Sequence, residues 1–428
     1  MSRSRSAAIQ SSSTGDAPFE RSVIYTASYK KYPFARSFND MTKPESLNPE
    51  TRREFAKLAM GGAALLASAA TSSATMRPIP PGIKIGTSAG RPSDENMLYL
   101  KQLGVTWVSL GATPATATAE GFIKMREQWE AGGFKVYNIG SGVGPSGSLH
   151  NMEEVTLNLP GRDKKIEEYL NYIRYLGKAG IPYSTYAHMG NGIWRSGRET
   201  LPRGYAGSSL DLSSPNAKGN WAGKTFSPPL SHGRVFSKEE IWDNYTYFIK
   251  QVVPVAEEAG VRIGIHPDDP PQPMLAGVPR CIFSNFEGYK RALEIANSPN
   301  IGVCLCCGSW LEGGKMTGKD PVEMIKYFGG MKKLFKIHFR NVSAPLPHFT
   351  ETMIDDGYYD MSKVMKALVD VKFDGIVIPD HVPGLGSNPA ADAPLGRRAA
   401  GAFQPSPALA YLLGCMNSML IAAQGKTG

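Results

Sequence analysis

Residues 82–424 predict a (β/α)8 barrel, the TIM-barrel fold, because two patterns run through them together. Short apolar, β-branched stretches alternate with amphipathic stretches, and eight such strand-then-helix pairs follow one another. Strands are expected at 83–86, 106–110, 135–139, 183–187, 262–266, 301–306, 335–339 and 375–379. Helices are expected at 95–103, 120–130, 164–178, 238–258, 287–296, 321–327, 361–368 and 407–422.

The helices are predicted from the spacing of their apolar residues. In the third of them, one face carries Ile166, Leu170, Ile173 and Leu176, which is the spacing of an amphipathic helix that covers a sheet. A doubly wound open sheet is the competing fold, and it would more often have a glycine-rich phosphate turn after its first strand. The nearest candidate, at 140–147, follows the third strand and does not open a helix. The barrel is therefore favoured.

Two connections are unusually long for a compact domain. Residues 196–236 follow the fourth strand and residues 383–404 follow the eighth, and both are dense in small residues and proline. Loops of this length are more often functional lids than plain connectors. Because loops that follow barrel strands lie at the C-terminal face, both are expected to cover the mouth of the barrel there.

The N-terminal part precedes the barrel and has a different composition. Residues 1–50 show no apolar periodicity and are expected to be disordered. Residues 51–74 hold Arg52-Arg53 before a short Ala- and Gly-rich run, the pattern of a twin-arginine export signal. The apolar run is too short to span a bilayer, so no stable membrane anchor is expected. This pattern predicts recognition by the twin-arginine export machinery and a periplasmic location; an amphipathic N-terminal helix is the alternative.

Composition limits the classes of partner. The chain has 428 residues, 42% of them hydrophobic, and a formal charge of +9. Much of the positive excess lies in the first 57 residues, and no arginine-rich helix or basic-aromatic motif follows. The remainder is mildly basic, which favours a small anionic substrate and not nucleic acid. Whether the chain forms a homo-oligomer is left open.

Four predicted strands in succession end in residues that bind metals. His266, Cys306, His338 and Asp380 lie at or near the C-terminal ends of the fifth to eighth strands, where catalytic residues of this fold meet. Together they offer two nitrogens, a sulfur and an oxygen, a set that suits Mn²⁺, Fe²⁺, Co²⁺ or Zn²⁺. Each residue alone has an ordinary structural explanation. Their equivalent places on successive units favour one shared metal site.

Cys306 is preferred to its two neighbouring cysteines as the sulfur ligand. Strand alternation sends Cys307 to the opposite face, and Cys304 shares the face of Cys306 but lies one layer deeper. With five cysteines in a chain of this length, a disulfide scaffold is not expected.

Other polar residues are expected around this site. Arg340, two positions after His338, could clamp a substrate carboxylate, or form a salt bridge at the barrel rim with Asp380 or Asp268. Its neighbour Asn341 is a further substrate candidate. His381 suits general acid–base catalysis, or could orient a metal ligand. The remaining candidates for contact with substrate or for support of the ligands are Asp268, Trp194 and Arg195.

At these residues the sequence resembles the mannonate dehydratase family, metal-dependent barrels related to xylose isomerase. The resemblance is carried mainly by His266-Pro-Asp-Asp-Pro-Pro271, Cys306-Cys-Gly-Ser309, Ile337-His-Phe-Arg-Asn-Val342 and Pro379-Asp-His381. It implies dehydration of D-mannonate to 2-dehydro-3-deoxy-D-gluconate with Mn²⁺ or Fe²⁺. It also implies that the four strand-end residues are the metal ligands and that His381 is catalytic.

One departure concerns a tyrosine that the family carries before its last helix. Here Leu409 stands at that position, and Tyr411 is the candidate that could replace it. The departure keeps two alternatives open: a metal-dependent sugar isomerase or epimerase on the same barrel, and an exported sugar-acid-binding protein without turnover.

Overall fold

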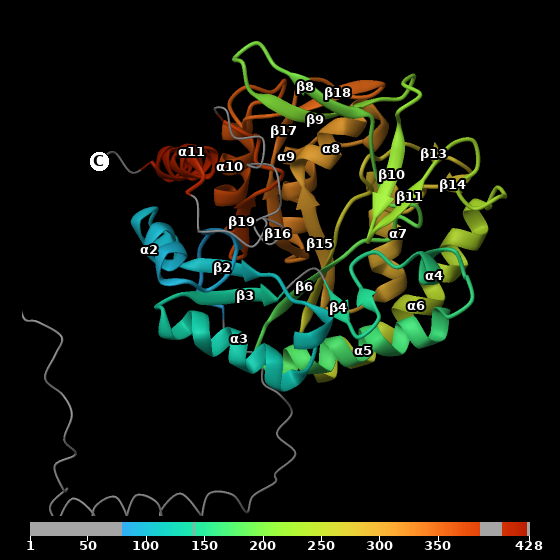
Figure 1. Cartoon of the computed structure of the whole chain (residues 1–428), viewed down its shortest axis with the longest axis horizontal. Coiled ribbons are helices and arrows are strands. Elements are labelled where there is room, and N and C mark those ends of the chain that lie inside the picture. Colours follow the sequence, from blue (N-terminus) through green and yellow to red (C-terminus); the bar gives the residue numbers. More distant parts are fainter. Residues whose placement is uncertain (1–78, 140–141, 386–404, 426–428) are drawn as a thin grey trace, which may run out of the picture. The chain divides into compact units, whose positions relative to one another are not determined.

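Eight parallel strands close into a barrel, and this confirms the predicted fold class (Figure 1). The computed structural model describes residues 79–139, 142–385 and 405–425, which all belong to the compact unit Thr71–Gly428. The barrel strands, in chain order, are β1 (Lys84–Ala89), β2 (Trp107–Leu110), β3 (Lys135–Ile139), β6 (Tyr183–Tyr186), β12 (Arg262–Ile265), β15 (Ile301–Cys306), β16 (Leu334–Phe339) and β19 (Ile376–Pro379). All eight lie where the sequence predicts a strand.

Helices follow the strands and cover the outside of the barrel. They are α2 (Asp94–Gln102), α3 (Ala119–Ala131), α4 (Glu153–Thr156), α5 (Arg162–Lys178), α6 (Lys238–Glu258), α7 (Phe286–Ala296), α8 (Cys307–Gly313), α9 (Pro321–Met324), α10 (Met361–Asp370) and α11 (Pro407–Ala423). The eight predicted helices are present, although the one at 321–327 divides into α9 and a π-helical turn, Ile325–Gly329. The short helix α8 was not predicted, and it begins directly after Cys306.

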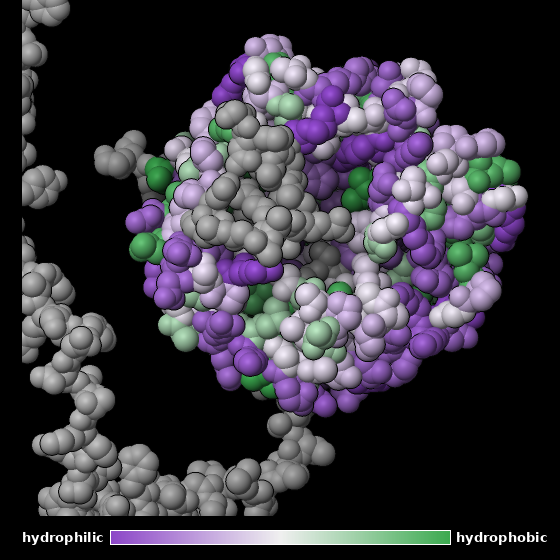
Figure 2. All heavy atoms as spheres, in the orientation of Figure 1, coloured by the Kyte–Doolittle hydropathy of each residue, from purple (hydrophilic) through white to green (hydrophobic). Residues whose placement is uncertain are grey.

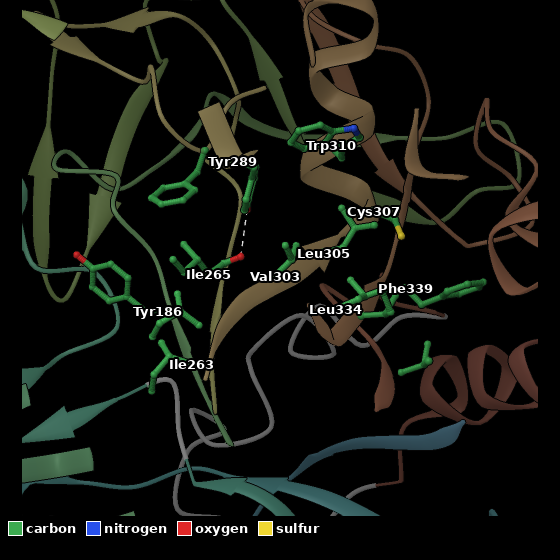
Figure 3. Packing of buried hydrophobic residues seen from close by; sticks show 14 of the residues in the cluster. Tyr186, Ile263, Ile265, Tyr289, Val303, Leu305, Cys307, Trp310, Leu334 and Phe339 are labelled. Carbon is green, nitrogen blue, oxygen red and sulfur yellow. Dashed lines mark hydrogen bonds between the residues drawn. The ribbon is translucent and has the colours of Figure 1, made fainter. Parts of the chain in front are cut away.

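The two faces of each barrel strand have different roles. Ile265, Val303 and Leu305 point outward and pack under the helices, where the Tyr289 hydroxyl donates a hydrogen bond to the Ile265 carbonyl at 3.1 Å (Figure 3). Alternation turns the residues between them toward the barrel interior. Register then sets the interior layers, because Cys306 is paired with His338 across β15 and β16.

The predicted lid at 196–236 is not a plain loop. It contains β8 (Gly197–Thr200), β9 (Ala206–Asp211), β10 (Lys218–Trp221) and β11 (Lys224–Phe226). Strand β9 pairs with β18 (His348–Thr352), which also pairs with β17 (Asn341–Val342), so a four-stranded sheet in the order β17-β18-β9-β8 covers one side of the mouth (Figure 1). A second small sheet joins β10 and β11 to β7 (Ile193–Arg195). The strands are too short and too rich in Gly and Ser to show an apolar alternation.

Two loops that follow barrel strands contain short antiparallel pairs. After β3, β4 (Val143–Gly144) pairs with β5 (Gly147–Ser148), and after β12, β13 (Met274–Leu275) pairs with β14 (Val278–Pro279). Of the second predicted lid, at 383–404, residues 386–404 lie outside the described residues, as do the predicted disordered segment 1–50 and export signal 51–74. Among the described residues, no helix has both the length and the apolar character needed to cross a membrane.

Candidate functional site

Three of the predicted metal ligands converge at the C-terminal end of the barrel. His266 follows β12, Cys306 ends β15 and His338 lies in β16, and one potential ligand atom of each lies within 4.8 Å of the other two. The fourth, Asp380, follows β19 beside them. Its Oδ2 is 3.5 Å from the Sγ of Cys306 and 3.6 Å from the Nδ1 of His338. The structure thus gathers the four strand-end residues at one place.

The state of these side chains fits a divalent metal ion. The Nδ1 of His266 is 2.7 Å from the Pro267 carbonyl, which assigns the proton to Nδ1 and leaves Nε2 with its lone pair. Burial lowers the pKa of both histidines, so both are neutral at neutral pH. The Nδ1 of His338 is buried and has no hydrogen-bond partner among the described residues. A buried nitrogen without a partner beside a thiol and a carboxylate is the donor arrangement that a metal ion satisfies.

Charge around Cys306 and Asp380 is set by burial and by neighbouring cations. Burial raises the pKa of the Cys306 thiol well above its usual range, and the Arg340 guanidinium opposes this effect. Burial also acts to raise the pKa of Asp380, but nearby His381, His338 and Arg340 hold it well below its usual range. The carboxylate is therefore ionised, while the thiol requires a stronger cation, such as a metal ion, to lose its proton.

Arg340 is the centre of the polar network behind these ligands. Its guanidinium donates to Ser309 at 2.8 Å, to Asp269 at 3.1 Å and to the Cys306 sulfur at 3.4 Å. The side chain is only 1% exposed and already pairs with acids, and its predicted contact with a substrate carboxylate stays a prediction. The alternative, a salt bridge, is present: the Nε of Arg340 lies 3.4 Å from Asp380. In the loop after β12, the acidic partner of Arg340 is Asp269 and not Asp268.

A glycine makes room for this arginine. A Cβ built at Gly308, in α8, would lie 2.2 Å from the Nε of Arg340. No side chain can approach a guanidinium so closely, because real Cβ contacts begin beyond about 3 Å. The packing of Arg340 against α8 therefore requires glycine at this position.

Arg195 belongs to the same network. It donates to Asp269 at 2.6 Å and to Glu351 at 2.5 Å, and lies 3.5 Å from Glu312. Arg340 also pairs with Glu312 and Glu351, so two arginines share three buried carboxylates. Burial raises the pKa of Glu312 to about 8. Arg195 is 15% exposed and remains at the edge of the site, but its charge is already matched by these acids.

His381 is held beside the ligands by a carboxylate. Its Nδ1 lies 2.7 Å from the Oε1 of Glu351 and 3.0 Å from Arg340, and its Nε2 lies 4.0 Å from Asp380. Its φ of 44° is in the left-handed region, which is uncommon for residues other than glycine. Burial acts to lower its pKa, but Asp380 and Glu351 outweigh burial and raise the pKa to about 9. The side chain is 36% exposed, so it can reach a bound molecule.

Two predicted substrate residues have structural partners instead. The amide of Asn341 donates to the carbonyls of Ile354 at 3.1 Å and Tyr359 at 2.8 Å, and the side chain is fully buried. Trp194 is 2% exposed, and its indole N–H donates to the Asn191 carbonyl at 3.1 Å. Both side chains support the loops of the site from behind, and their predicted contact with a substrate stays a prediction.

Asp268 lies inside the same loop as Asp269. It is 2% exposed, and burial raises the pKa of its carboxyl to about 7, against the effect of nearby Arg280. The backbone N–H of Asp268 donates to the Phe283 carbonyl at 3.1 Å. Its predicted contact with substrate stays a prediction.

The structure does not bring Tyr411 to this centre. The hydroxyl of Tyr411 donates to Asp355 at 2.5 Å and accepts from Arg203 at 3.4 Å, and the side chain is 37% exposed on α11. Leu409, at the position where the family carries tyrosine, is 2% exposed in the apolar core. In this structure Tyr411 is paired away from the four strand-end residues, and its predicted replacement of the family tyrosine stays a prediction.

Several polar residues of the site were not selected from the sequence. Glu351 and Glu312 lie in elements that were not predicted, β18 and α8. His150 lies in the loop after β3, with its ring 6.2 Å from that of His266 and 5.3 Å from that of Trp221. Lys336 precedes His338 by two positions in β16, and strand alternation alone would have turned it toward the interior.

Figure 2 shows the viewed face of the molecule hollowed near its centre, with hydrophilic residues on part of the rim.

Comparison with known proteins agrees with this arrangement. A family model described as D-mannonate dehydratase (UxuA) matches residues 224–420, which include all four strand-end residues and His381. The mannonate dehydratase of Streptococcus equi subsp. zooepidemicus is 31% identical over 280 residues, covering 61% of this chain and 74% of the relative. That of Thermotoga neapolitana is 32% identical over 290 residues, covering 61% and 77%. The chain belongs to the mannonate dehydratase family.

The solved structures lead to the same family. The crystal structure of mannonate dehydratase from Streptococcus suis serotype 2 matches with a TM-score of 0.66 and 27% identity, over 82% of this chain and 96% of that chain. The resemblance found in the sequence is thus confirmed, and so is the expectation of an enzyme of the hydro-lyase class.

Replacing Arg340 with Met is expected to lower the free energy of unfolding by about 3–5 kcal/mol, because three buried carboxylates would lose their central counter-charge. Urea denaturation of the variant and the wild-type protein, at equal metal content, measures this difference.

Arg203→Met is the matched control, since Arg203 is 43% exposed and its ion pair with Asp355 is expected to contribute no more than about 1 kcal/mol. Equal losses in the two variants would contradict the central role given to Arg340.

Proposed function

We propose that this protein dehydrates D-mannonate, or a closely related sugar acid, to 2-dehydro-3-deoxy-D-gluconate, with a divalent metal ion. The observation that carries the proposal is the convergence of His266, Cys306, His338 and Asp380 beside a histidine held by a carboxylate. Membership of the mannonate dehydratase family supports the choice of substrate.

His266, Cys306, His338 and Asp380 would hold the ion, and their mixed nitrogen, sulfur and oxygen donors suit Mn²⁺ or Fe²⁺. When bound, such an ion acts as a Lewis acid for substrate oxygens and stabilises negative charge that develops as the C2 proton leaves. In this reaction the C2–H bond breaks and its proton passes to solvent water, a C2–C3 double bond forms, and the C3 hydroxyl departs.

His381 gives the proton that turns the departing C3 hydroxyl into water. The carboxylate of Glu351 binds Nδ1 and stabilises the imidazolium, while Nε2 is left for transfer. The enol that remains rearranges to the 2-keto acid. Glu351 itself is oriented by Arg195 and Arg340, so the buried arginines act on catalysis by positioning the carboxylate that holds His381.

The proposed ligand set is tested with Cys306→Ser. We expect the variant to lose most of its bound Mn²⁺ or Fe²⁺ after removal of excess ion, because a serine hydroxyl is a much poorer ligand than a thiolate. Metal content by elemental analysis, and formation of a 2-keto-3-deoxy acid from D-mannonate, are the two measurements.

Cys304→Ser is the control for this test, because Cys304 lies in the same strand one layer deeper and should leave metal content unchanged. Retention of metal by Cys306→Ser would contradict the ligand set. If wild-type protein with bound metal changed the configuration of a sugar without loss of water, the isomerase alternative would replace the dehydratase; binding without turnover would favour the sugar-acid-binding protein.

Replacing His381 with Asn is expected to reduce kcat about 10²–10⁴-fold, the usual contribution of a general acid, with little change in metal content. Steady-state kinetics with D-mannonate and elemental analysis of the variant measure both quantities. A fall in metal content equal to that of Cys306→Ser would instead indicate that His381 serves to orient the ligands.

We also propose that the protein is exported to the periplasm by the twin-arginine machinery. The support is the pair Arg52-Arg53 before a short Ala- and Gly-rich run. In a bacterial host with that machinery, Arg52→Lys together with Arg53→Lys is expected to shift the protein from the periplasmic to the cytoplasmic fraction, as measured by immunoblotting. An unchanged distribution, or a cytoplasmic location of the unaltered chain, would contradict export.

A further inference from the structure

Lys336 is a buried lysine in the interior of the barrel. It lies in β16, two positions before His338, and is 4% exposed. Register pairs it with Cys304 on one neighbouring strand and with Ile376 on the other. Because residues two apart in a strand share a face, Lys336 lies one layer below the residues that gather at the end of the barrel.

The ammonium group of Lys336 has no polar partner in the part of the chain that the structure describes. Its Nζ lies over the ring of Tyr183, at 5.9 Å from the ring centroid. Two other lysines with low exposure do have hydrogen-bond partners. Lys84 donates to the carbonyl of Gly82 at 2.7 Å, and Lys333 donates to the carbonyls of Ser298 and Ile301. Burial lowers the pKa of Lys336, and a bound anion would oppose this effect and keep the ammonium charged.

The other buried cations near the site are already paired. Arg340 and Arg195 share Asp269, Glu312 and Glu351. Arg280 donates to the Pro270 carbonyl at 3.1 Å and to the Asn191 side chain at 3.0 Å. Among the described residues of the site, Lys336 is left as the cation that can meet a new anion.

Charge balance leads to the same residue. A thiolate at Cys306 and the carboxylate of Asp380 together neutralise a divalent ion, so the ligand set carries no net positive charge for a substrate carboxylate. Lys336 interacts electrostatically with Cys304 in its own layer, and with Asp380, His338 and His150. Its charge therefore acts on the space around the ligands.

We propose that Lys336 binds the carboxylate of the sugar acid and so selects acids over neutral sugars. This role of Lys336 rests on the proposed function, because it requires a sugar acid as the substrate. The ammonium forms an ion pair with the carboxylate, and the hydroxyls at C2 and C3 are then turned toward the four strand-end residues and His381.

The test is equilibrium binding by calorimetry to Mn²⁺-loaded protein that carries His381→Asn, in which turnover is slow, with D-mannonate and with D-mannitol, which has the same carbon chain without the carboxylate. Lys336→Met is expected to weaken D-mannonate binding at least about 30-fold, the usual effect of removing one partner of a buried charge pair, and to leave D-mannitol binding unchanged. In turnover, KM should rise more than kcat falls.

Lys333→Met is the matched control, because Lys333 is a half-buried lysine that directly precedes β16, at the end of the strand away from the proposed ligands. It should change neither affinity. Lys336→Gln provides a second variant if the methionine variant does not fold, and circular dichroism and metal content establish that each variant is intact.

Equal weakening of D-mannonate and D-mannitol binding would overturn the proposal, and so would unchanged D-mannonate binding. If the wild-type protein binds D-mannonate without dehydrating it, the proposed reaction is contradicted. The effect of Lys336→Met on D-mannonate binding can still be measured in that case, so the two proposals are distinguished. If it does not bind D-mannonate, the same comparison uses D-gluconate and D-glucuronate; failure to bind any of these acids would also overturn the proposal.

Discussion

The buried guanidinium of Arg340 is the interaction on which the rest of the site depends. It contacts Cys306 and Asp380 on one side and Asp269, Glu312 and Glu351 on the other. An arginine is suited to this place because its planar group donates in several fixed directions at once, which a lysine ammonium does not. The strand ends, α8 and the sheet over the mouth are thereby fixed relative to one another by one side chain.

The same network divides the charges of the site into two groups. Arginines and carboxylates satisfy one another behind the ligands, where Arg340 and the three acids are almost fully buried and Arg195 is 15% exposed. His381 lies beside the proposed ligands with Nδ1 on Glu351 and Nε2 left for proton transfer, and Lys336 has no ion-pair partner among the described residues. The residues that orient the site are therefore different from those proposed to bind the substrate or to transfer protons.

Much of this could be predicted from the sequence. The barrel strands and their helices carry strong apolar periodicity, and His266, Cys306, His338 and Asp380 stand at equivalent points of successive units. What the sequence did not predict was the buried environment of the polar residues beside them. Arg340 and Asn341 share a strand end with His338, but their exposure depends on α8 and on the loop at 354–359, which have no distinctive local pattern. Glu351 could not be placed because β18 pairs with β9, about 140 residues earlier in the chain, and such long-range pairing leaves no local signal.

The sheet over the mouth has a further consequence through Glu351. This residue lies in β18, opposite Val342 of β17, and the next strand in the sheet, β9, comes from the connection after the fourth barrel strand. A slip of one residue between β9 and β18 would turn Glu351 to the other face of the sheet and away from His381. The segment predicted as a lid is therefore paired to the strand whose Glu351 holds His381, so a movement of this cover would also move the carboxylate on which the histidine depends.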